Sequence, residues 1–230
     1  MKKCKLFMIL LLILLIAFPV SASASAGGWK VIKARYSFLT PDQEIIFNRA
    51  TEKQVGVEFK PVALLAEQVV AGMNYVYLCQ VTPSVLTTKT TKKAWLILTA
   101  YKSLQNSVVL ESAGRISISS IYTKNNPRNS FSDGGLRIIP VKNELGVLSA
   151  SASEVFFKGT ENYDGYDLRP IALLGTLAVG GKDYRFLCYG TGTGTNAATR
   201  DIFVVDIYKD LNGNCRVISC EPVNLEKYMY

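Results

Sequence analysis

The sequence predicts an α+β protein made of two tandem copies of one unit, each a helix followed by antiparallel strands. Three observations predict it. Residues 64–79 align with residues 173–188 at a constant offset of 109. A well-capped helix start stands early in the first copy, and apolar and polar residues alternate in the segments after it, as they do in half-buried strands. A helix followed by four such strands covers one face of the sheet that they form, which is an α+β arrangement.

The repeat extends beyond its best-matched part. Upstream, residues 60–63 align with residues 169–172 at the same offset. Downstream the offset becomes 107, where residues 97–104 meet residues 204–211. Two residues have therefore been gained in the first copy, and we assign them to the loop between Thr82 and Lys93, because loops absorb such changes at little cost.

The repeat sets the expected domain boundaries. We expect a first unit at residues 27–124 and a second unit at residues 131–230, joined by a polar stretch around Pro127. Each unit is long enough to form a single core of its own, and two copies are too few for a solenoid.

Residues 1–26 have the composition of a secretory signal peptide. Three lysines precede an apolar run over residues 6–20, which is too short to span a bilayer comfortably, and small residues over 21–26 offer cleavage sites. Cleavage would lower the net charge from +8 to +5. We therefore expect a secreted, extracellular or periplasmic protein, monomeric and without membrane association once it is processed.

The composition argues against most catalytic chemistry. Histidine is absent, which excludes serine and cysteine triads, histidine general bases and most zinc or copper sites. The aspartates of the second unit show no spacing that singles out an acid/base pair. The 26 basic and 18 acidic residues are scattered, whereas nucleic-acid binding needs clustered basic residues. We expect no enzyme activity, no cofactor, no metal and no nucleic-acid partner.

The four cysteines after the signal leave two alternatives open. An even number in an exported chain is compatible with two disulfides, which can pair in three ways. Cys79 and Cys188 hold equivalent places in the repeat, so each is equally well explained as a buried free thiol. The disulfide candidates are Cys79, Cys188, Cys215 and Cys220.

The first helix has a clear start signal. Thr40 is a good N-cap, Pro41 suits the first helical position, and Gln43 is placed for a capping box. Gly56 is the expected end. In the second unit we expect a helix from Pro140, with an apolar stripe formed by Val141, Leu145, Leu148, Ala152 and Val155.

Alternating segments after each helix predict the strands. In the first unit they are residues 57–67, 73–82, 94–102 and 108–119, and their counterparts lie around Leu168, Tyr184, Ile202 and Arg216. A glycine-containing kink at residues 68–72 reads as a hairpin tip of small apolar residues. Because loop tips are normally polar, an apolar tip indicates contact with a partner. The alternative is that Val69 and Val70 are buried strand residues.

The string Gln68, Val69, Val70, Ala71, Gly72, followed by Asn74 and Tyr75, resembles the first inhibitory hairpin of the cystatins, which are protein inhibitors of papain-like cysteine proteases. The resemblance implies a cystatin-like fold of one helix on a four- to five-stranded antiparallel sheet in each unit. It also implies a wedge of three pieces: an N-terminal glycine segment and two hairpins. Their expected protease-binding residues are Gly27, Gly28, Gln68, Val69, Val70, Ala71, Gly72, Ser103, Leu104, Gln105 and Asn106.

The resemblance has limits that shape the functional expectation. The second hairpin is similar to that of the stefin subgroup and lacks the Pro-Trp pair of secreted animal cystatins. The second unit has Leu177–Gly181 in place of the hairpin string, so weak or no inhibition is expected from it. We expect Gly72→Glu to abolish inhibition with the fold intact.

Two other functional readings stay open. One is a secreted cystatin-like interaction module that does not inhibit proteases, because fold and function separate readily. The other is that the two units pack through their hairpins and block the site.

Overall fold

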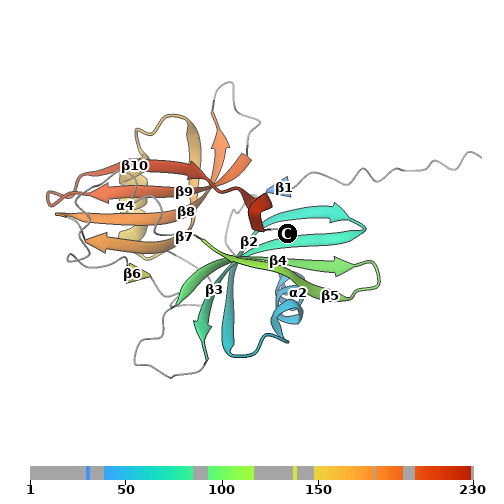
Figure 1. The fold of residues 1–230 in the computed structure, drawn as a ribbon. Coiled ribbons are helices and arrows are strands. Elements are labelled where there is room, and N and C mark those ends of the chain that lie inside the picture. Colours follow the sequence, from blue (N-terminus) through green and yellow to red (C-terminus); the bar gives the residue numbers. More distant parts are fainter. Residues whose placement is uncertain are drawn as a thin grey trace, which may run out of the picture.

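The structure is a computed structural model that describes residues 30–31, 39–84, 93–116, 137–138, 148–178, 180–193 and 200–228. Within these ranges the chain forms two five-stranded antiparallel sheets, with one α-helix on each (Figure 1). The first unit contains β1 (Lys30–Val31), α2 (Pro41–Thr51), β2 (Val57–Val70), β3 (Gly72–Pro83), β4 (Ala94–Ser103) and β5 (Val108–Arg115). The second contains β6 (Arg137–Ile138), α4 (Ala150–Thr160), β7 (Tyr166–Ala178), β8 (Lys182–Gly192), β9 (Arg200–Lys209), β10 (Cys215–Pro222) and the 3-10 helix η2 (Leu225–Tyr228).

The α+β class and the two sheets predicted from the repeat are confirmed. The sheet orders are β1-β2-β3-β4-β5 and β10-β9-β8-β7-β6. In both units, therefore, strands that are consecutive in the chain are neighbours in the sheet. Even the irregularities repeat. Register shifts between β2 and β3 fall at Pro61/Ala63 and Leu64/Ala66, and those between β7 and β8 fall at Pro170/Ala172 and Leu173/Gly175. Each bulge in the second unit therefore lies 109 residues after its counterpart in the first.

The first helix starts as predicted and ends early. The side chain of Thr40 accepts a hydrogen bond from the backbone N–H of Gln43, and the Gln43 side chain accepts one from the Thr40 N–H, so the capping box is present. The helix ends at Thr51, whose hydroxyl donates to the carbonyl oxygen of Phe47 at 3.0 Å. Gly56, expected as the helix end, instead adopts φ +83° in the turn that leads into β2.

The second helix begins later than the apolar stripe indicated. Ser149 is its N-cap, because its backbone is extended and its side chain accepts a hydrogen bond from the N–H of Ala152 at 3.3 Å. Leu148 therefore precedes the helix, and the expectation of one helix through this position is wrong. Val141 and Leu145 lie outside the described residues.

The core is arranged in four layers, in the order helix, sheet, sheet, helix. Each helix covers the outer face of its own sheet, with Phe47 of α2 and Phe156 of α4 fully buried against the strands. The inner faces of the two sheets meet in a third cluster, which takes buried side chains from both units. Its members include Val62, Leu65, Val76, Leu78, Trp95, Ile97, Ile171, Leu174, Leu187, Tyr189, Ile202, Val204 and Leu225.

Hydrogen bonds reinforce this shared cluster. The indole N–H of Trp95 donates to the carbonyl oxygen of Leu174 at 2.7 Å, linking the two sheets. Near the C-terminus, the carbonyl oxygen of Tyr228 accepts from the hydroxyl of Thr99 at 2.9 Å and from that of Ser112. Helix η2 thus fastens the end of the second unit onto β4 and β5. The expectation of one independent core per unit does not describe this packing, because the largest cluster belongs to both units.

We predict that the first unit will not fold alone. A fragment of residues 27–124 would expose the inner sheet face, including Val62, Leu78 and Ile97, which are at most 2 % exposed in the whole chain. Size-exclusion chromatography and circular dichroism should show aggregation or loss of tertiary structure, whereas residues 27–230 should unfold in one cooperative transition. A monomeric fragment with its own cooperative transition would contradict the shared core.

The second sheet also buries an ion pair. Arg185 on β8 donates from Nε and Nη2 to the two carboxylate oxygens of Asp206 on β9, both at 2.7 Å, and the side chains are 0 % and 1 % exposed. Because side chains alternate between the two faces of a sheet along each strand, Arg185 and Asp206 lie on the inner face of the second sheet, as Leu187 does. In the first sheet the corresponding register pair is Val76 with Thr99, so this pair distinguishes the two units.

Breaking the ion pair from one side should be costly. Arg185→Met leaves the Asp206 carboxylate buried without its main partner, so we expect a loss of about 3–5 kcal/mol in the free energy of unfolding, measured with urea. Adding Asp206→Leu removes the stranded charge and should recover most of that loss. A double variant as unstable as the single one would mean that the cost comes from packing and not from charge.

Candidate functional site

The candidate site lies where two hairpins of the first unit end together. The first hairpin joins β2 to β3 at Val70, Ala71 and Gly72, and the second joins β4 to β5 through residues 104–107. Gly72 and Ser103 are register partners on neighbouring strands, so the two hairpins end side by side. We call residues 68–72 and 103–107 the first-unit tip.

Exposed apolar side chains mark this tip. Val69 is 52 % exposed and Leu104 is 75 % exposed, and they stand on adjacent hairpins. Ala71, Gln105 and Asn106 are exposed, whereas Gln68, Val70 and Ser103 are half-buried. Val69 and Val70 are therefore not interior strand residues, and that alternative interpretation is wrong.

Hydrogen bonds hold both hairpins in place. The hydroxyl of Tyr101 donates to the carbonyl oxygen of Ala71 at 2.6 Å, tying the second hairpin's strand to the first hairpin. Asn74 donates from its side-chain amide to Oε1 of Gln68 at 3.1 Å across the base of the first hairpin. The hydroxyls of Ser103 and Ser107 lie 2.8 Å apart across the second. These bonds fix the tip before any partner arrives, which lowers the entropic cost of binding.

The anchoring role of Tyr101 was missed by the sequence reasoning. Tyr101 lies just before the second hairpin and was not among the expected contact residues. The repeat carried a signal for it, because Tyr208 is its counterpart at the offset of 107 and donates to the carbonyl oxygen of Gly180 at 3.1 Å. A tyrosine kept at both positions indicates a shared role in anchoring the first hairpin of each unit.

Gly72 is required by the backbone. Its φ is +146°, and a Cβ there would collide with the carbonyl oxygen of Lys102 and with the ring of Tyr101. Gly72→Glu cannot therefore leave the fold intact, and that expectation is wrong. Exposed residues such as Val69 are the better positions for testing the tip.

The remaining expected piece of the wedge lies outside the described residues. Gly27 and Gly28 precede β1, whose Lys30 pairs with Glu67 beside the first hairpin. The structure thus brings together two of the three expected pieces, the hairpins at Gln68–Gly72 and at Ser103–Asn106.

The second unit forms the same pair of hairpins at the other end of the molecule (Figure 1). Lys182 and Lys209 are register partners there, Gly181 has φ +155°, and Leu211 is 85 % exposed. We call residues 178, 180–182 and 209–214 the second-unit tip. Because the units meet through their sheet faces, the hypothesis that their hairpins block one another is wrong.

The four cysteines are free thiols in the structure. Cys79 faces α2 in the first sheet, whereas Cys188, Cys215 and Cys220 lie in or against the cluster beneath α4. The two clusters are on opposite sides of the packed sheets, so Cys79 has no route to a disulfide with the others. Burial raises the pKa of the Cys79 thiol to about 12 and raises that of Cys188 well above its ordinary value.

We predict a matching order of cysteine reactivity. The thiolate is the nucleophile, so the raised pKa values of Cys79 and Cys188 should make both nearly inert to iodoacetamide at pH 8 in the folded chain. Half-buried Cys215 should be alkylated first. Peptide mass spectrometry over a time course measures the order, and labelling in urea should remove the difference. Fast labelling of Cys79 without denaturant would contradict the burial.

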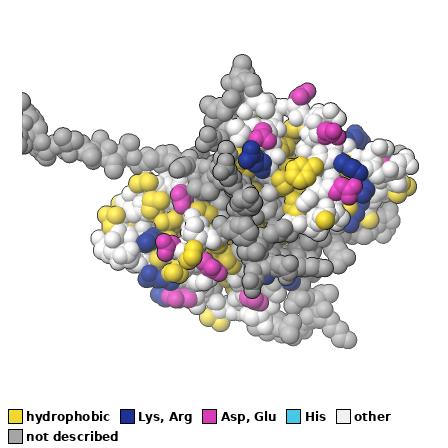
Figure 2. Space-filling model, turned by 180° about the vertical axis from the view of Figure 1, so that it is seen from behind, with side chains coloured by type: hydrophobic (Ala, Val, Ile, Leu, Met, Phe, Trp, Pro, Cys, Tyr) yellow, Lys and Arg dark blue, Asp and Glu magenta, His cyan; other side chains and the backbone are white. Residues whose placement is uncertain are grey.

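Neither the overall distribution of charge nor the hydropathy of the helices indicates a further functional site. On the face drawn in Figure 2, basic and acidic side chains are interspersed over both units. Among the described residues, no helix is both long and apolar enough to cross a membrane.

Comparisons with known proteins do not assign the chain to a family. No protein-family model matches it, and no curated protein does. Among solved structures it has a likeness to one described as "Ntf2 like protein involved in plasmid conjugation", at 9 % identity over 82 % of this chain and 90 % of that chain, with a TM-score of 0.23. A TM-score this low does not establish a shared fold, so no functional conclusion is drawn from it.

Proposed function

We propose that the chain is a secreted, reversible inhibitor of papain-like cysteine proteases, which acts by inserting the first-unit tip into the active-site cleft. The observation that carries the proposal is the pairing of Gly72 with Ser103, which sets exposed Val69 and Leu104 on two adjacent hairpins. The strand order β1-β2-β3-β4-β5 with one helix on the sheet also supports a cystatin-like unit.

Inhibition of this kind depends on how the hairpin fits the protease cleft and requires no chemical reaction between the two proteins. A papain-like protease attacks an extended peptide carbonyl with a thiolate in a narrow cleft. The first hairpin presents a tight turn at Ala71 with its backbone already engaged by Tyr101, so it fills space without offering a peptide in register for attack. Val69 and Leu104 supply apolar burial, and Gln68 and Asn106 supply polar contacts at the rim.

A charge at the tip should remove inhibition. Val69→Glu places a carboxylate where the proposed complex buries an apolar side chain, so we expect the inhibition constant for a papain-class enzyme to rise about 30-fold or more. The measurement is a titration of enzyme activity with processed chain, residues 27–230, which should show stoichiometric loss of activity for the unmodified protein. Val69 is half-exposed in the free chain, so the variant should fold normally.

A matched control comes from the other end of the molecule. Leu211→Glu changes the second-unit counterpart of Leu104, at a similarly exposed position, and should leave inhibition unchanged. Equal losses for Val69→Glu and Leu211→Glu would place the inhibitory surface elsewhere. Absence of any stoichiometric inhibition by the unmodified chain would refute the proposal.

A second candidate function is a secreted interaction module that binds a partner other than a protease. The specific observation in its favour is that the second unit retains the paired hairpins, the tyrosine anchor and an exposed leucine although the inhibitory string is absent. The tip architecture is thus kept independently of that string. This candidate predicts that Val69→Glu abolishes capture of a non-protease partner while the unmodified chain leaves papain-class activity intact.

A further inference from the structure

A hollow of about 640 Å³ lies between the C-terminal turn of α4 and residues 163–168, and we call it the α4 groove. Helix α4 packs mainly over β9 and β10, which leaves room for this groove over the start of β7. Tyr166 and Leu168 line it from the sheet, and Phe157 lines it from the helix. Strand β7 runs from here to the second-unit tip at Ala178, so the groove and that tip lie at opposite ends of the strand. A hollow of this volume accommodates a small organic molecule.

Three aromatic rings line the groove. Phe157 is 64 % exposed, whereas Tyr163 and Tyr166 are half-buried. The ring centroid of Tyr166 lies 4.4 Å from that of Phe203, and the hydroxyl of Tyr163 donates to the thiol of Cys220. Because these contacts hold the two tyrosines in place before a ligand enters, the entropic cost of binding is lowered.

This aromatic lining belongs to the second unit. Helices α2 and α4 are both 11 residues long, and their first residues keep the repeat offset of 109. At that offset the aligned pairs around the groove are Phe157 with Asn48, Tyr163 with Gln54, Tyr166 with Val57, and Leu168 with Phe59. Three rings in the second unit therefore stand against one at the same positions in the first.

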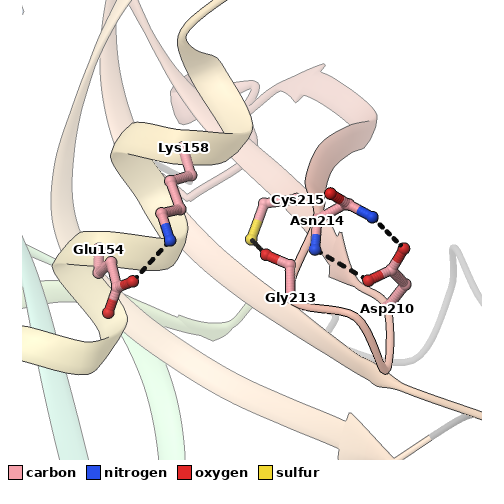
Figure 3. Close-up of polar contacts among 6 residues, drawn as sticks. All are labelled: Glu154, Lys158, Asp210, Gly213, Asn214 and Cys215. Carbon is pink, nitrogen blue, oxygen red and sulfur yellow. Dashed lines mark hydrogen bonds and ion pairs between the residues drawn. The ribbon is translucent and has the colours of Figure 1, made fainter.

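The charged side chains around the groove leave a net negative charge. Lys158 lines the groove, and Figure 3 shows its ammonium turned toward Glu154, at 2.8 Å. Asp167 pairs with Arg169 at 3.3 Å. Glu161 is the C-cap of α4, where the helix dipole adds further negative potential. No ion pair within the described ranges engages Glu161, so its carboxylate sets the sign of the local charge.

Aromatic rings beside an unpaired carboxylate suit an organic cation. The face of an aromatic ring attracts a cation through its quadrupole, and a carboxylate adds direct charge attraction. The hydroxyls of Thr160 and Thr193, which also line the groove, already donate to the carbonyl oxygens of Phe156 and Gly165. Glu161 is therefore the strongest acceptor that the groove offers, and an anionic ligand would be repelled by it.

We propose that the α4 groove binds a small organic cation, with the apolar part of the ligand against Phe157 and Tyr166 and its ammonium group beside Glu161. The groove shares no residue with either tip, so the proposal does not depend on protease inhibition.

The test is a titration of isotope-labelled residues 27–230 with benzyltrimethylammonium, followed by the amide shifts in NMR spectra. We expect saturable shifts at residues 157–168 and at Thr193. Benzyl alcohol, which has the ring without the charge, should bind about tenfold more weakly. Phe157→Asn installs the first-unit residue at an exposed position and should raise the dissociation constant about fivefold. Glu161→Gln should raise it about threefold at low salt.

The matched controls lie in the first unit. Ile45→Asn removes a 55 % exposed apolar side chain from α2, and Glu52→Gln removes the C-cap carboxylate of that helix, so both should leave binding unchanged. Ligand-free amide spectra check that each variant is folded. Equal losses in the controls, unchanged affinity in both groove variants, or equal affinity for benzyl alcohol or phenylacetate would overturn the proposal. Shifts confined to other residues, or no saturable shift, would also overturn it.

Discussion

The face-to-face burial of the two sheets is the constraint on which the rest of the structure depends. Each sheet has a helix on its outer face and the other sheet on its inner face, so both faces are covered. Trp95 shows how closely the layers meet, because its indole N–H reaches the backbone of Leu174 in the other unit. The hairpin ends extend beyond this packing, where Val69, Leu104 and Leu211 are exposed, and they point to opposite ends of the molecule.

This arrangement explains how one repeated unit can carry two different surfaces. The backbone of each tip is held by the same devices: a glycine at positive φ against the neighbouring strand and a tyrosine that donates to the hairpin carbonyl. Those side chains on this frame that are exposed can change with little effect on stability. Half-buried Met73 and exposed Lys182 occupy the same register position, yet one side chain is apolar and the other is charged.

Much of the fold could be predicted from local signals. The capping box at Thr40 and the constant repeat offset located the first helix and most of the strands, because caps and strand alternation are properties of short segments. The packing of one unit on the other could not be predicted, since Leu65 and Leu174 carry no sign of which sheet they will face. At the site, the apolar hairpin from Gln68 to Gly72 was visible as a motif. The anchor made by Tyr101 and the steric demand at Gly72 depend on a neighbouring strand, and pairing register was not readable from the motif.

The central claim is that the first-unit tip is the surface that enters a protease cleft. Hydrogen exchange of residues 27–230, alone and with an active-site-blocked papain-class enzyme, tests it most directly. We expect added protection at the amides of residues 69–72 and 103–107 and none at residues 209–214. No added protection at the first tip, or protection confined to the second, would contradict it.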